Sequence, residues 1–192
     1  RTGEILGADI MLEWIYLTNR VRYSEIFENQ EIRENDFCHN SLIKQENRIF
    51  GKLATEALDL NENEISRLYE EDLYQLILHE VGHTLGLNHN FAASTLHNNS
   101  DVHNPKITYK EGLSSSVMDY HALNIAPIGV EQGQYADVKP GKYDILAIKY
   151  GYTPKLSKKD LNNMLEKYSS DEYLFGNDGD DMRSPGKGID PR

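Results

Sequence analysis

The sequence predicts a single α/β (α+β) domain of 192 residues, and three observations lead to this fold class. An apolar segment near the N-terminus alternates loosely, as a strand does. Two longer segments repeat their apolar residues with the period of a helix. The length, with 39% hydrophobic residues, is enough for one buried core, and no apolar run is long enough to cross a membrane.

The first elements are a strand candidate and a helix. Residues 4–12 are apolar enough for a strand. Residues 43–58 predict a helix, because apolar side chains return on one face of it. These are Phe50, Leu53, Ala54, Ala57 and Leu58.

A longer, largely buried helix is predicted from Asn61 to about Leu85. Asn61, with Glu64 three residues later, resembles a capping box at the helix start. Gly86 supplies a left-handed stop at its end.

The remainder of the chain predicts a loop and two short helices. Residues 88–116 are polar and carry no period, which indicates a loop. Residues 143–150 predict a helix closed by Gly151, and residues 158–168 predict another, capped by Ser157.

The charge and the cysteine content exclude several classes of protein. The formal net charge of −11 argues against a nucleic-acid binder, which needs a basic surface, and against docking on an anionic membrane. The one cysteine, Cys38, cannot form an intrachain disulfide, and we interpret it as a small buried apolar side chain.

One stretch, from His79 to His89, carries the spacing of a metal site. His79 and His83 are four residues apart, so on a helix both imidazoles project from one face. Gly86 lets the helix end abruptly, and the reversed chain brings His89 back as a third ligand. Three neutral imidazoles leave one position of a tetrahedral zinc ion open for water.

A water molecule at the open position of the zinc ion indicates a site that hydrolyses an acyl bond. Zinc lowers the pKa of its water to about 7 and polarises a carbonyl group. Glu80 lies about 100° around the helix from His79, so it reaches the same cavity without being a ligand. We assign it as the general base that takes the proton from the metal-activated water and passes it to the leaving amine.

Two other interpretations of this stretch were weighed. A structural histidine pair would explain His79 and His83 alone, but not Glu80, Gly86 and His89 at their offsets. A di-iron half-site would use Glu80 and His83, but it needs a second Glu-x-x-His, which the sequence lacks.

The motif His79-Glu80-x-x-His83-x-x-Gly86-x-x-His89 resembles the zinc signature of the metzincin metallopeptidases. Ser116-Val117-Met118-Asp119-Tyr120, beginning 27 residues after His89, resembles the Met-turn of serralysins and astacins. The resemblance implies that Met118 is a structural platform beneath the metal. It also implies that Tyr120 ligates the resting metal and then swings to stabilise the oxyanion.

The chain most resembles the bacterial Met-zincin family, whose members are large proteins common in Bacteroidetes. The residues that carry this resemblance are Arg1–Ile5, His79–Phe91, Ser116–Tyr120, Asn124–Ala126, Tyr143–Tyr152 and Asp190–Arg192. We therefore expect a catalytic domain over residues 1–170 and an acidic, Gly-rich linker or tail over residues 171–192. We expect the chain to be part of a larger exported protein, in the periplasm, on the cell surface or secreted.

The resemblance also implies an architecture. A mixed sheet would pack on the long helices, with a helix-rich part after the Met-turn. The lowest edge strand, for which Ile5–Leu12 is a candidate, would bind an extended peptide by strand addition. Residues His121–Gly129 would form the wall of the S1′ pocket. Asn90, after the third histidine, departs from the residues characteristic of several metzincin families.

The expected function is that of a zinc-dependent endopeptidase acting on protein or peptide substrates, with one catalytic zinc ion. Two alternatives use the same residues: a catalytically silent zinc module that binds peptides or glycans, and a zinc amidase acting on a non-protein acyl substrate. The sequence does not define the oligomeric state, the natural substrate or the S1′ specificity.

The remaining histidines and a cluster of aspartates are not assigned to the metal site. We expect His97, His103 and His121 to lie in loops and to face solvent. Asp178, Asp180 and Asp181 suggest calcium because oxygen ligands cluster there. The twelve-residue calcium loop with its terminal Glu is absent, so a solvated linker is favoured at these positions.

Overall fold

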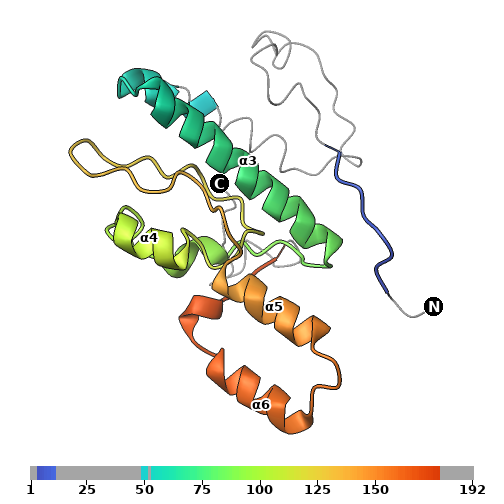
Figure 1. The fold of residues 1–192 in the computed structure, drawn as a ribbon. Coiled ribbons are helices and arrows are strands. Elements are labelled where there is room, and N and C mark those ends of the chain that lie inside the picture. The colour runs from blue at the N-terminus through green and yellow to red at the C-terminus, as the bar shows by residue number, and fades with distance from the viewer. Residues whose placement is uncertain (1–3, 12–48, 52, 178–192) are drawn as a thin grey trace.

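The computed structural model describes residues 4–11, 49–51 and 53–177. Its longest element is α3 (Glu62–Thr84), and five shorter elements follow. They are η2 (Ala93–Leu96), α4 (Pro105–Glu111), α5 (Lys142–Tyr152), α6 (Lys158–Lys167) and η3 (Asp171–Tyr173). Figure 1 shows α3 crossing the upper part of the view, with α4, α5 and α6 below it and residues 4–11 on its other side.

The helix predicted from Asn61 is confirmed, but the expectation that it is largely buried was wrong, because only five of its 23 residues are buried. Local chemistry explains both of its ends. The Asn61 side chain accepts hydrogen bonds from the backbone N–H groups of Asn63 and Glu64. At the other end Gly86 has a φ of 87°. There the N–H of Gly86 donates to His83 O and that of Leu87 to Gly82 O, which is a Schellman ending.

The other helix predictions have mixed outcomes. Of the helix predicted at 43–58, residues 49–51 and 53–57 are helical, whereas residues 43–48 and 52 lie outside the described residues. The helix capped by Ser157 is confirmed as α6. The helix predicted at 143–150 is confirmed as α5, but it continues to Tyr152 and Gly151 does not stop it.

The prediction of a loop throughout residues 88–116 was wrong at α4. The Asn104 side chain caps this helix by accepting from the N–H of Lys106, and Pro105 occupies its first position. Gly112, with a φ of 91°, ends it. These three residues are a local start and stop signal within a polar segment.

The expected mixed sheet is contradicted. Across residues 4–11, 49–51 and 53–177 no segment forms a strand. The candidate edge strand at Ile5–Leu12 is not one over its described residues: Leu6 and Met11 are more than nine-tenths exposed. Leu12 lies outside the described residues. Loose alternation is not enough for a strand, because a strand also needs a hydrogen-bonded neighbour.

Side chains, rather than a strand ladder, satisfy the backbone of residues 124–135. The Asn124 amide group donates to Gln134 O and Val102 O. Gln132 donates to Asn124 O and accepts from the N–H of Ala126. Two bonds join the two arms of this segment through the backbone alone: Asn124 N–H donates to Tyr135 O, and at the tip Val130 N–H donates to Pro127 O. The segment is therefore an irregular loop that needs no sheet.

This loop packs on the first half of α3 and forms the small apolar core. Leu68 of α3 contacts a buried cluster of Leu123, Tyr135 and Ala136. The Tyr135 hydroxyl donates to Glu64, and the guanidinium of Arg67 lies 4.8 Å from the centre of its ring. These contacts hold the first half of α3 against the loop. The two helix histidines of the candidate site lie on its second half. None of the helices in the described ranges is long and apolar enough to span a membrane.

Candidate metal centre

The second half of α3 presents two histidines on one face. His79 is 1% exposed, and its ring meets that of His83 edge to face, with centroids 4.8 Å apart. The four-residue spacing places both side chains at nearly the same angle around the helix. The sequence prediction that these two residues lie together is therefore met by the geometry of α3.

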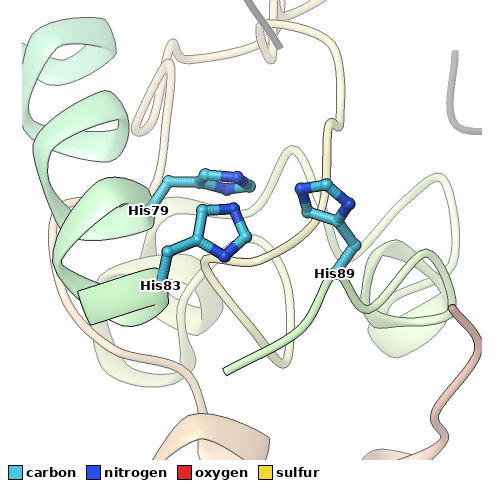
Figure 2. A group of neighbouring side chains, drawn as sticks. All are labelled: His79, His83 and His89. Atoms are coloured by element: carbon cyan, nitrogen blue, oxygen red, sulfur yellow. The ribbon is translucent and has the colours of Figure 1, made fainter. Parts of the chain in front are cut away.

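The turn at Gly86 brings the third histidine back to the other two. Ring centroids lie 5.3 Å apart for His79 and His89, and 4.9 Å apart for His83 and His89. One nitrogen from each ring lies within 4.8 Å of the others. Figure 2 shows His79 and His83 projecting from α3 toward His89, which comes from the segment after the turn.

Backbone carbonyls set the tautomers of the two helix histidines. His79 Nδ1 lies 2.8 Å from Val117 O, and His83 Nδ1 lies 3.0 Å from Leu87 O. A carbonyl oxygen only accepts, so both Nδ1 atoms carry hydrogen and both Nε2 atoms keep a lone pair. These two oriented imidazoles, together with that of His89, fit a zinc ion, which binds neutral nitrogens at roughly 2.0–2.1 Å.

Tyr120 also lies at this cluster. Its hydroxyl oxygen is 2.5 Å from His89 Nε2, and its ring stacks on His79 with centroids 5.2 Å apart. Tyr120 is 3% exposed. A hydroxyl group is therefore placed beside the nitrogens that would hold the metal.

Met118 packs against α3 at Gly82, which lies between His79 and His83 in the sequence. It is 1% exposed, and a Cβ added at Gly82 would overlap its sulfur atom. Glycine at position 82 is therefore favoured by the close approach of Met118 to α3. The sequence analysis missed Gly82, because nothing local links it to a residue 36 positions later.

Asp144, which the sequence analysis also missed, holds the segment from Ser116 to Met118 in place. Its buried carboxylate accepts from the Ser116 hydroxyl and from the N–H groups of Val117 and Gly141. Burial raises the pKa of Asp144 above its ordinary value, against these hydrogen bonds, which favour the charged form. Because Val117 O accepts from His79, Asp144 supports a ligand through the backbone.

His121 does not face solvent as expected. Its side chain is 9% exposed, and Nε2 lies 3.1 Å from Asp137 Oδ2. Burial opposes the charged imidazole, but the hydrogen bond and charge of Asp137 outweigh it and raise the pKa of His121. Burial likewise opposes the Asp137 carboxylate, and the bond from His121 outweighs it and lowers the pKa of Asp137. The two groups form a buried hydrogen-bonded pair, which is an ion pair when His121 is protonated.

Asn90 ties the third histidine to two distant segments. Its backbone N–H donates to Met118 O, and its amide group donates to Leu174 O. Its side-chain oxygen accepts from the N–H of Gly176. Asn90 is fully buried. Asn90 is thus a structural link at the site.

Glu80 and the remaining candidates are placed as follows. Glu80 is half-buried on α3, directly after His79. His97 bonds to Gly112 O in the loop region, outside the histidine cluster. Cys38, Asp178, Asp180 and Asp181 lie outside the described residues, and no finding supports calcium.

Comparison with known proteins identifies the family of the chain. No curated protein and no solved structure matches it. The Met-zincin family model matches residues 61–192, which include all three histidines, Glu80 and Met118. The match covers more than half of the sequence, and the chain therefore belongs to the Met-zincin family, with a metzincin-type zinc metalloprotease domain.

Proposed function

We propose that this chain is a zinc-dependent endopeptidase. The observation that carries the proposal is the cluster of His79, His83 and His89, whose ring nitrogens lie within 4.8 Å of one another. Carbonyl groups fix the Nδ1 hydrogens of the two helix histidines and turn their basic nitrogens to the cluster. Family membership favours zinc as the ion and a polypeptide as the substrate.

The general base in this proposal is Glu80. When bound, zinc supplies a Lewis acid that lowers the pKa of water and polarises the scissile carbonyl group. Glu80 takes the proton of the attacking water and donates it to the nitrogen of the leaving amine. Its position directly after His79 on α3 supports this role.

Tyr120 and Met118 have distinct roles. The Tyr120 hydroxyl donates a hydrogen bond to the oxyanion that forms on the former carbonyl oxygen. Its oxygen lies 2.5 Å from His89 Nε2, which supports a position beside the reacting carbonyl. Met118 packs against Gly82 and is a structural support for α3 rather than a ligand.

A Glu80→Ala variant tests the mechanism. We expect the variant to bind zinc as the wild type does and to lose cleavage of a broad peptide library. Loss of a positioned general base typically costs about 10²–10⁴-fold in rate. Equal cleavage by the variant and the wild type would refute the role of Glu80.

The same digest separates the two alternative functions. Cleavage that stops on chelation and returns with zinc supports the endopeptidase. Zinc binding with no chelator-sensitive cleavage of peptides would favour the silent module. Hydrolysis confined to small N-acyl amides would favour the amidase. The exported location remains a proposal, which fractionation of the source cells would test.

A further inference from the structure

A hollow lies between the metal-binding turn and the two C-terminal helices. Its volume is about 370 Å³, and we call it the α5–α6 hollow. One wall is Gly86–Asn88, the turn that joins His83 to His89. Four residues of α5, two of α6 and Phe175 form the remainder: Tyr143, Leu146, Ala147, Tyr150, Met164 and Leu165 on the helices.

Most residues that line this hollow are apolar, and several of them are exposed to solvent. No residue of α6 is buried, although Leu161, Met164 and Tyr168 recur at intervals of three and four on one side of it. Leu165 is 59% exposed and Tyr150 is 57% exposed. An amphipathic helix normally buries its apolar side, so this one has room for an apolar partner.

The two helices that line the hollow, and the loop between them, are rich in exposed lysines in an otherwise acidic chain. Residues 139–168 contain seven lysines and three acidic residues, whereas the whole chain contains 20 basic and 31 acidic residues. Lys149, Lys155, Lys158 and Lys159 form no salt bridge among the residues that the structure describes. Lys158 lies two helical turns before Leu165 on the same side of α6. The complementary ligand is therefore acidic as well as apolar.

The hollow adjoins the metal centre without containing it. Leu87 lines the hollow and accepts the hydrogen bond from His83 Nδ1. Phe175 lines it from the other side, between Leu174 and Gly176, which are both bonded to Asn90. A polypeptide held in the hollow thus lies beside the turn that joins His83 to His89.

We propose that the α5–α6 hollow is an exosite, which binds an acidic segment of the polypeptide substrate through an apolar side chain of that segment. The proposal rests on the endopeptidase function. The apolar side chain enters between α5 and α6, and its acidic neighbours pair with the exposed lysines of these helices and of the loop between them. Binding there raises the local concentration of the scissile bond at the metal and leaves the chemical step unchanged.

The test compares two peptide substrates that share one cleavable sequence. One carries a tail of Glu and Leu residues, and the other carries a tail of Gln and Ser residues of equal length. We expect the acidic tail to lower KM by about tenfold, the effect of burying one large apolar side chain, with kcat unchanged. Equal KM values for the two peptides would overturn the proposal.

Two matched pairs of variants locate the effect. Leu165→Asp places a carboxylate in the hollow, and Asn163→Asp makes a carboxylate of an exposed residue elsewhere on α6. Lys158→Glu reverses charge on the Leu165 side of α6, and Lys159→Glu does so at the next residue, away from that side. We expect Leu165→Asp and Lys158→Glu to abolish the KM advantage and the two controls to keep it. Equal effects within each pair would contradict the exosite.

Binding measured without cleavage separates this proposal from the endopeptidase proposal. The labelled Glu/Leu tail is titrated with metal-free Glu80→Ala protein and followed by fluorescence anisotropy. Saturable binding that Leu165→Asp removes would support the hollow as a binding site even if no peptide is cleaved. No binding of the tail, in a protein that cleaves peptides, would overturn the exosite alone. Binding that weakens as the protein self-associates would assign the hollow to a second copy of the chain and also overturn it.

Discussion

The contact between Gly82 and Met118 predicts that the effect of Gly82→Ala on the free energy of unfolding depends on the residue at position 118. In a helix interior alanine is favoured over glycine by about 1 kcal/mol. At position 82 the added Cβ would overlap the Met118 sulfur, and such overpacking costs about 1–3 kcal/mol. We therefore expect Gly82→Ala to be neutral or to lower the free energy of unfolding by up to about 2 kcal/mol.

A double-mutant cycle isolates the clash. In a Met118→Ala background the overlap is absent, so Gly82→Ala should raise the free energy of unfolding by about 1 kcal/mol. Gly151→Ala is the matched control, because it lies in α5 with nothing within 4 Å of the added Cβ, and it should stabilise in both backgrounds. Urea unfolding of the metal-free variants, followed by circular dichroism, measures these differences. If Gly82→Ala and Gly151→Ala stabilise the wild-type background equally, the packing of Met118 against α3 is wrong.

Three further predictions concern the surroundings of the three histidines. Tyr120→Phe should bind zinc normally and lower kcat by about 10²–10³-fold, as loss of one oxyanion donor does, and an unchanged kcat would refute its role. Asn90→Ala leaves buried backbone partners unsatisfied and should lower the free energy of unfolding by about 1–3 kcal/mol, and a change near zero in urea unfolding would contradict the link. The raised pKa of His121 stabilises the fold below pH 6.5 and loses this effect as the pH rises through the raised value. The lowered pKa of Asp137 stabilises above pH 3.8 and loses its effect as the pH falls. The stability difference between wild type and His121→Gln should therefore shrink from pH 5.5 to pH 9, and a constant difference would contradict the ion pair.

Local signals in the sequence predicted much of what positions the cluster. The Asn61 cap, the Gly86 turn and the Ser157 cap each depend on contacts within a few residues, so a short motif is enough to define them. The return of His89 toward His79 follows from the same turn, because the two histidines are only ten positions apart. The helix that begins at Pro105 also has local start and stop signals. The polar composition of residues 88–116 nevertheless favoured a loop.

Features that depend on distant partners could not be predicted in this way. The expected sheet failed over the described residues, because alternation does not indicate whether a partner strand is present, and side-chain amides satisfy the backbone of residues 124–135 instead. The burial of His121 depends on Asp137, sixteen residues later and in another part of the loop. The preference for glycine at position 82 depends on Met118 in the same way.

The zinc content of the purified protein tests the central claim most directly. After zinc loading and dialysis, mass spectrometry should find about one zinc ion per wild-type chain, since three imidazoles and one water complete a single tetrahedral site. His83→Ala should lose that ion, whereas His97→Gln, outside the cluster, should retain it. A wild-type chain that binds no zinc, or a His83→Ala chain that keeps the full amount, would contradict a metal centre built from these histidines.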